Sequence, residues 1–337
     1  MWLVRIGTPT LKLALATLAL ATLAGCGNSL GNSNNHGQQI RLFTPDSDSG
    51  TFDFFLEALE LEGQRKDVQA SSDDNTLITG VAGDADALGY LGFAYYSEHS
   101  ERLRAVPIQA GPNSEPVAPS LETIYSGTYA PLSRPLFIYV KHEAMKRPEV
   151  ARFVTFYLQN IERLAFEGGY VPPTERERAE NLATLERLKR AVGPPTEPDR
   201  PVVVDGSSTV YPISASAQEA YDDATPGRSP KIVVDLHGTG GGFGRYVQGE
   251  VDIVDASRPA RPKEEQAALE RGYDWTRFVV GHDGITVVVH SQNDFVDKLT
   301  IEQLRLLFQP ESPIHTWKDL DPSWPSSALM AASAGSD

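Results

Sequence analysis

One junction constrains the fold of this chain more than any other stretch. Three β-branched residues at 202–204 run into Gly206 and a group of hydroxyl side chains, and a helical pattern begins near Pro212. A short β-branched run is typical of a strand buried on both faces, as in a parallel sheet. The first N–H groups of the following helix are unpaired, so we expect an anion to bind there. The hydroxyls belong to Ser207, Ser208 and Thr209, and Val210 follows them.

A serine or threonine before a helix is most often only its N-cap, so one such junction is weak support for a site. The arrangement recurs twice, however. A strand at 232–236 runs into a glycine-rich loop at 238–242 that contains Thr239, and a strand at 40–43 runs into a third loop. The third loop contains Asp48, Ser49, Gly50 and Thr51. Three loops of this kind at strand ends predict a shared oxyanion site.

Ser257 and Arg258 follow another strand-like run at 251–256. A guanidinium at the end of a strand can contact an oxyanion through two parallel hydrogen bonds. A surface salt bridge is the plain alternative for Arg258.

Length and charge exclude some classes of protein. With 337 residues the chain is long enough for two domains. Its net charge of −15 argues against nucleic acid or an anionic membrane surface as a partner. Any bound anion must therefore be held by local donors.

The N-terminal region resembles a bacterial lipoprotein signal. Basic residues and an apolar run precede Leu-Ala-Gly and then Cys26, the single cysteine of the chain. We expect residues 1–25 to be removed and Cys26 to carry lipid, with 26–39 as a flexible tether. The expected location is the periplasm or the outer face of the cell membrane. An ordinary secretory signal with an incidental cysteine is the alternative.

Strands alternate with helices along the rest of the chain, which predicts an α/β fold with mostly parallel sheets flanked by helices. One amphipathic helix is expected over 148–166. A second begins at Thr174, which forms a capping-box pattern with Glu177, and a proline-rich linker follows at 193–201. Residues 326–337 have no pattern and are expected to form a disordered tail.

Several motifs together resemble the periplasmic phosphate-binding proteins of bacterial phosphate ABC transporters. They lie within residues 40–173 and 201–325. They are Asp48-Ser49-Gly50-Thr51-Phe52, the segments 127–135 and 169–172, Asp205-Gly206-Ser207-Ser208-Thr209-Val210, the loop 238–242, Asp255-Ala256-Ser257-Arg258-Pro259 and Asp283-Gly284-Ile285. The two blocks stand in the reverse of the family's order, so the chain looks like a circular permutant. Its new ends lie near Ile40 and Pro325, and residues 174–200 bridge the family's own termini.

The resemblance implies a two-lobed, type II-like periplasmic-binding-protein fold with the ligand cleft between the lobes. One lobe would combine 40–131 with 285–325. The other would be 132–284, including the bridging helix and linker. Crossovers between them are expected near 131–135 and 283–284.

The resemblance also implies high-affinity binding of inorganic phosphate as the solute-binding component of an ABC importer. Permease subunits would be the partners, the protein would be a monomer, and it would need no cofactor, metal or catalysis. The implied ligand-binding residues are Asp48, Ser49, Gly50, Thr51, Ser207, Ser208, Thr209, Val210, Thr239, Ser257 and Arg258. Asp48 and Asp46 are the first candidates to accept the phosphate proton, which sulfate lacks, and Asp205, Asp255 and Asp283 are the next candidates. Some family members have an Asp at Ser257 and an Arg at Pro45, so the cationic role is assigned to Arg258.

Three alternatives remain from the residues alone. Asp48-Ser49-Gly50 and Asp205-Gly206-Ser207 superficially match acid proteases, but those enzymes are all-β. A phosphate-ester hydrolase is a second alternative, although the seven histidines have no metal-ligand spacing. The third keeps the fold and changes the ligand to another oxyanion, such as sulfate or molybdate, or to a phosphorylated organic molecule.

Overall fold

The computed structural model of the chain describes residues 39–198, 200–227 and 231–326. The expected signal and lipid-attachment cysteine, nearly all of the tether and the tail from 327 lie outside the described residues. No helix within the described ranges is both long enough and apolar enough to span a membrane.

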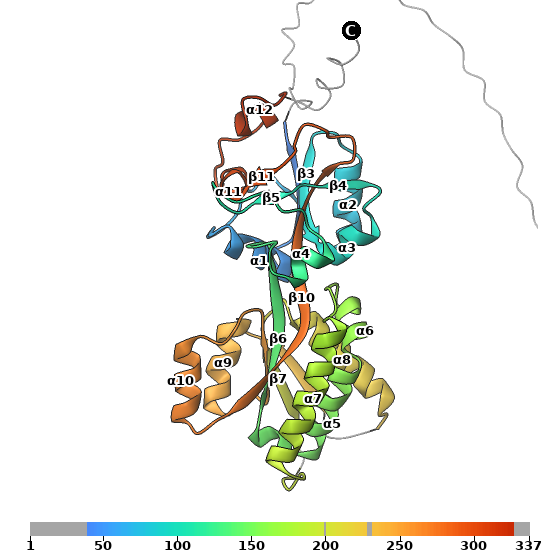
Figure 1. The fold of residues 1–337 in the computed structure, drawn as a ribbon, viewed down its shortest axis with the longest axis vertical. Coiled ribbons are helices and arrows are strands. Elements are labelled where there is room, and N and C mark those ends of the chain that lie inside the picture. The colour runs from blue at the N-terminus through green and yellow to red at the C-terminus, as the bar shows by residue number, and fades with distance from the viewer. Residues whose placement is uncertain (1–38, 199, 228–230, 327–337) are drawn as a thin grey trace, which may run out of the picture. The chain divides into compact units, whose positions relative to one another are not determined.

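Two long strands, β6 (Ser133–Lys141) and β10 (Trp275–His290), pair with each other and divide the other elements into two halves (Figure 1). The upper half in Figure 1 contains β1 (Arg41–Pro45), α1 (Gly50–Ala58), β2 (Gln69–Ser71), α2 (Asp74–Ala82), β3 (Ala87–Gly92), α3 (Phe93–Glu98), β4 (Leu103–Ala105), β5 (Ile108–Gln109), α4 (Leu121–Tyr125), β11 (Leu299–Thr300), α11 (Ile301–Phe308) and α12 (Trp317–Leu320). The lower half contains the 3₁₀ helix Glu143–Lys146, α5 (Pro148–Gln159), α6 (Ile161–Glu167), α7 (Glu175–Val192), β7 (Val202–Gly206), α8 (Tyr211–Ala224), β8 (Ile232–Leu236), α9 (Gly238–Gln248), β9 (Ile253–Ala256) and α10 (Pro262–Glu270).

The main sheet has the strand order β2-β1-β3-β10-β6-β9-β7-β8, and β4 also pairs with β10. β1 is parallel to β2 and β3, and β7 is parallel to β8 and β9. Every antiparallel pairing between the named strands involves β6 or β10. The predicted α/β class is confirmed. The sheet is mixed, because the two long strands run against their neighbours.

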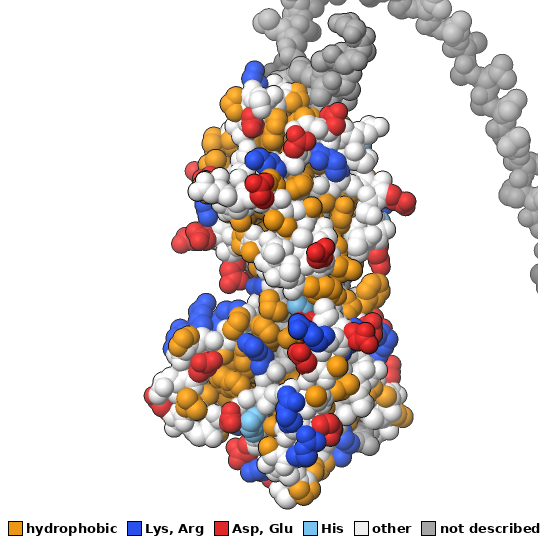
Figure 2. All heavy atoms as spheres, viewed as in Figure 1, with side chains coloured by type: hydrophobic (Ala, Val, Ile, Leu, Met, Phe, Trp, Pro, Cys, Tyr) orange, Lys and Arg blue, Asp and Glu red, His pale blue; other side chains and the backbone are white. Residues whose placement is uncertain are grey.

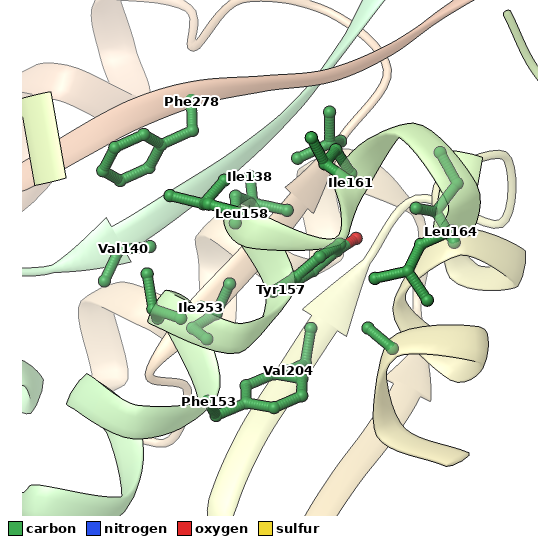
Figure 3. Packing of buried hydrophobic residues seen from close by; sticks show 14 of the residues in the cluster. Ile138, Val140, Phe153, Tyr157, Leu158, Ile161, Leu164, Val204, Ile253 and Phe278 are labelled. Carbon is green, nitrogen blue, oxygen red and sulfur yellow. The ribbon is translucent and has the colours of Figure 1, made fainter. Parts of the chain in front are cut away.

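The lower half is built on strands that bury both faces. Along β6, Leu136, Ile138 and Val140 point to one core, while Phe137 and Tyr139 point to another. The alternation follows from the two-residue period of a strand. Helices cover both faces, with α5, α7 and α8 on one and α9 and α10 on the other (Figure 1). Figure 3 shows the first core, where α5 residues pack against strand residues such as Val204 and Ile253.

The upper half repeats this arrangement on β10 and β3. Ile285, Val287 and Val289 face a core that includes Phe55 of α1, whereas Val288 faces α2. Residues 281–289 of β10 are all buried. Because each buried Val or Ile contributes about 1.5–3 kcal/mol, this double-sided burial fixes both halves to the long strands.

Two local predictions need correction. The single helix expected over 148–166 is divided at Asn160 into α5 and α6. The Asn160 side chain donates to the carbonyl oxygen of Phe156 at 2.8 Å, and such side-chain hydrogen bonds compete with the helical ladder. The glycine-rich stretch 238–242 is the first turn of α9 and not a loop, since the helix begins at Gly238.

Candidate anion-binding site

The junction after β7 forms a tight turn against β9. Gly206 has φ +146°, and a Cβ atom there would collide with the carbonyl oxygen of Asp255. Only glycine fits this combination of dihedral and close approach. The N–H of Ser207 donates to the same carbonyl at 3.0 Å, and the N–H of Thr209 donates to Ser207 Oγ at 3.2 Å. The turn is therefore fixed at the N-terminus of α8.

A cavity of about 290 Å³ lies beside this turn, and we call it the hydroxyl cavity. Five hydroxyl side chains and three arginines line it, together with two carboxylates and two glycines. Its residues are Asp53, Glu57, Arg134, Ser207, Ser208, Thr209, Gly238, Thr239, Gly240, Ser257, Arg258 and Arg261. Six of the predicted binding residues thus meet at one place: Ser207, Ser208, Thr209, Thr239, Ser257 and Arg258.

Thr239 and Ser257 contact each other in the lining of the hydroxyl cavity. Their hydroxyl oxygens are 3.3 Å apart, and the N–H of Ser257 donates to Thr239 Oγ1 at 3.3 Å. Arg258 donates to both carboxylate oxygens of Glu264, each at 2.8 Å. Arg258 therefore forms the salt bridge that was the plain alternative, and it also lines the hydroxyl cavity. Figure 2 shows Lys and Arg side chains, together with Asp and Glu side chains, on the surface where α9 and α10 lie.

Arg134 is the main cavity residue that the sequence analysis missed. It lies on β6 opposite Asp283 of β10. Its Nη2 donates to Thr209 Oγ1 at 3.0 Å, and its Nη1 donates to Glu57 Oε2 at 3.0 Å. Burial raises the pKa of Asp283 to about 6, and the nearby Arg134 acts in the opposite direction. The place of Arg134 in the 127–135 motif, at an expected crossover, was a signal that could have identified this residue.

The two carboxylates that line the hydroxyl cavity were also not predicted from the sequence. Asp53 and Glu57 are four residues apart on α1, so they lie on one face of the helix. Ser208 Oγ donates to Asp53 Oδ2 at 3.1 Å. The spacing of these two acids after the Ser49-Gly50 junction was the available signal.

The four binding residues predicted at the start of α1 lie elsewhere. Asp48, Ser49, Gly50 and Thr51 line a second cavity of about 630 Å³, which we call the acidic cavity because it also contains Asp46, Asp74 and Glu167. Ser49 accepts a hydrogen bond from the N–H of Thr51, as an ordinary N-cap does. Burial raises the pKa of Asp74 to about 6, with a contribution from Asp73. Ser208 lines both cavities.

Three more residues singled out in the sequence have structural partners. Val210 is fully buried in the core beneath α8. Asp205 is buried and contacts His237 at 3.0 Å and Arg245 at 2.6 Å. Asp255 is also buried, and its Oδ1 accepts from Ser214 Oγ at 2.9 Å. None of the three lines the hydroxyl cavity.

Comparison with known proteins places the chain in a family. A family model described as a PBP superfamily domain matches residues 16–160 and 180–336. Protein SphX of Synechococcus elongatus is 42% identical over 163 residues, which are 46% of this chain and 48% of SphX. The phosphate-binding protein PstS of Staphylococcus saprophyticus is 38% identical over 129 residues, 38% of this chain and 39% of PstS. The chain thus spans less than half the length of these relatives.

A solved structure shows the same fold. The phosphate-binding protein of a phosphate ABC transporter from Streptococcus pneumoniae superposes with a TM-score of 0.61. The superposition covers 84% of this chain and all of the other, at 19% sequence identity. The predicted periplasmic-binding-protein fold is confirmed.

Proposed function

This chain belongs to the PBP superfamily, and we propose that it binds inorganic phosphate as the extracytoplasmic solute-binding component of a phosphate ABC importer. The names of the relatives PstS and of the Streptococcus protein support phosphate as the ligand. Binding occurs without catalysis. Permease subunits in the membrane are the proposed partners, and the protein acts as a monomer anchored through Cys26.

One observation carries the proposal: five hydroxyl side chains and the guanidinium of Arg134 converge on a single small cavity. Hydroxyls donate to phosphate oxygens, and a guanidinium fork matches their geometry. Hydrogen bonds to a charged group contribute about 1.5–3 kcal/mol each, which compensates for the removal of water from the anion. Arg258 adds a second guanidinium next to Ser257.

The same geometry favours closure of the two halves around the anion. Asp53 and Glu57 come from the upper half, whereas Ser208, Thr239 and Arg258 come from the lower half. We take these halves as the two lobes, 40–131 with 285–325 and 132–284. A ligand held from both sides favours the closed arrangement because each lobe contacts the same ion.

Selectivity for phosphate over sulfate requires an acceptor for the phosphate proton. Asp48 and Asp46 line the acidic cavity, so we assign this role to Asp53 of the hydroxyl cavity. One Asp53 oxygen accepts from Ser208, and a carboxylate has acceptor capacity for further bonds. Glu57 is less suited because it contacts Arg134.

We also propose that the chain order is permuted relative to the family. The N–H of Ile40 donates to the carbonyl oxygen of His315 at 2.8 Å, so one proposed new end lies beside the C-terminal segment that leads to the other, Pro325. Permutation is tolerated where ends are close together and exposed. In this proposal α7 and the following linker join the ends that are free in the family.

Calorimetric titration of the purified protein with phosphate, and then with excess sulfate, tests the function. We expect saturable phosphate binding that sulfate does not displace. Arg258→Ala should weaken binding by about tenfold or more. Arg187→Ala is the matched control, because Arg187 is exposed on α7 and donates to Thr184. No phosphate binding, or equal effects of the two substitutions, would contradict the proposal.

A further inference from the structure

Arg134 is held by contacts from several elements at once. It belongs to β6, and its side chain is only 13% exposed. Its guanidinium carbon lies 3.7 Å from the centroid of the Phe54 ring. Its Nε is 3.6 Å from Asp283 Oδ2, and neither atom has a hydrogen-bond partner. The two Nη atoms are thereby directed toward Thr209 and Glu57.

The two main arginines of the hydroxyl cavity have different counter-ions. Arg258 forms two hydrogen bonds with Glu264, whose side chain is 10% exposed. Arg134 forms one hydrogen bond with Glu57, whose side chain is 61% exposed. A bidentate, shielded ion pair is strong, whereas an exposed single contact contributes little. Glu57 is therefore much easier to replace as a partner of Arg134 than Glu264 is as the partner of Arg258, while the buried Asp283 stays beside Nε of Arg134.

The position of Glu57 also matters. It lines the cavity itself, whereas Glu264 does not. A carboxylate in the wall of an anion site repels the anion and occupies a donor that the anion needs. Glu57 occupies such a donor, because its Oε2 takes the Nη1 donor of Arg134. Its side chain is 61% exposed, so solvent screens its direct repulsion of the anion.

We propose that Arg134 pairs directly with the bound anion, next to an Arg258 that stays paired with Glu264, and that Glu57 is a built-in counter-ion of Arg134 which the anion must replace. The assignment rests on the proposed phosphate binding and extends it. Glu57 then lowers the affinity for phosphate and so sets the concentration at which the cavity fills.

Phosphate titration of four variants by calorimetry tests this assignment. Glu57→Gln should tighten phosphate binding by about two- to fivefold, the effect expected for one exposed ion pair. Glu60→Gln removes the same charge from the end of α1, where Glu60 is 81% exposed and contacts Arg305. It should leave the affinity unchanged. Arg134→Gln should weaken binding by about tenfold or more.

The double variant Arg134→Gln with Glu57→Gln completes a double-mutant cycle. If Glu57 acts through Arg134, Glu57→Gln gives no gain once Arg134 is replaced. Equal affinities of Glu57→Gln and Glu60→Gln, or a gain in affinity that persists without Arg134, would overturn the roles assigned to Arg134 and Glu57. The proposed phosphate binding would then still stand. Absence of phosphate binding by the unchanged protein would overturn the proposed function and, with it, this assignment. Thermal unfolding of each variant shows that a change in affinity is not a loss of folded protein.

Discussion

The backbone of Gly50 lies directly against the backbone of Thr209. A Cβ atom on residue 50 would be 2.6 Å from Thr209 Cα and 2.9 Å from its nitrogen. Gly50 begins α1 in the upper half, and Thr209 lies between β7 and α8 in the lower half. The absence of a side chain at residue 50 therefore lets the two halves approach where the hydroxyl and acidic cavities meet.

Gly50→Ala should keep the halves apart. Because closure brings the Asp53 acceptor of one half and the hydroxyl donors of the other to one ion, we expect phosphate affinity to fall by about tenfold or more. The unfolding temperature should change little, since neither core loses a side chain. Gly63→Ala is the matched control, because a Cβ there meets nothing within 4 Å. Wild-type phosphate affinity in Gly50→Ala would contradict this role.

Asp53→Asn should reduce selectivity. The amide keeps the size of the side chain but has only one acceptor oxygen and adds an N–H, so the preference for phosphate over sulfate should narrow by about tenfold or more. The measurement is the ratio of the two dissociation constants. Asp48→Asn, in the acidic cavity, should leave that ratio unchanged. The opposite ranking of the two variants would return the acceptor role to Asp48.

Thr239→Ala and Thr51→Ala compare the two cavities with the same chemical change. Thr239 lines the hydroxyl cavity, and Thr51 lines the acidic cavity. Loss of a donor to a charged ligand costs about 1.5–3 kcal/mol, so Thr239→Ala should weaken phosphate binding strongly. Thr51→Ala should weaken it much less. Calorimetry that shows a larger effect at Thr51 would favour the start of α1 as the binding site.

Asp255 should make stability depend on pH. Burial raises its pKa to about 8, partly opposed by the Ser214 hydrogen bond, whereas the unfolded carboxyl titrates near 4. Between these values the folded state holds a proton that the unfolded state has lost. Its stabilising contribution is thus fully present below about pH 4 and is lost as the pH rises through about 8.

Asp255→Asn removes this titration and keeps an oxygen for the Ser214 hydroxyl. The loss of unfolding free energy between pH 5 and pH 8 should therefore be smaller in the variant, by more than about 1 kcal/mol. Denaturant unfolding at the two pH values measures it. Parallel pH profiles for the variant and the unchanged protein would show that Asp255 is not the titrating group.

Restoring the family order tests the permutation. A chain that begins at Pro201, joins residue 325 to Ile40 through a short flexible linker, and ends at Pro198 keeps α7 and its buried Leu185 and Leu188. It should fold and bind phosphate with an affinity close to that of the original order. A folded reordered chain without phosphate binding would argue against the permutation.

Local patterns predicted most of the secondary structure. The strand expected at 202–204 is β7, and the capping box expected at Thr174 is present, with the N–H of Thr174 donating to Glu177 at 2.8 Å. These features depend on neighbours in the sequence, which is why they could be predicted. The division at Asn160 depends on a side-chain hydrogen bond that helical periodicity does not report.

The site was predictable only in part, because the missing part depends on tertiary structure. Ser207, Thr239 and Arg258 follow strand ends of one sheet, so their meeting could be inferred. The orientation of α1 could not be inferred from the sequence. The side of α1 that carries Asp53 and Glu57 lines the hydroxyl cavity, whereas the start of the helix lines the acidic cavity. Arg134 and Thr209 are 75 residues apart in the chain, and no local spacing connects them.

We expect a tetrahedral oxyanion to occupy the hydroxyl cavity. Arsenate has the shape of phosphate, and arsenic scatters X-rays anomalously, so crystals of the protein grown with arsenate test the claim directly. We predict one strong anomalous peak within hydrogen-bonding reach of the Thr239 hydroxyl and the Arg134 guanidinium. A peak in the acidic cavity beside Asp48, or none in either cavity, would contradict the account.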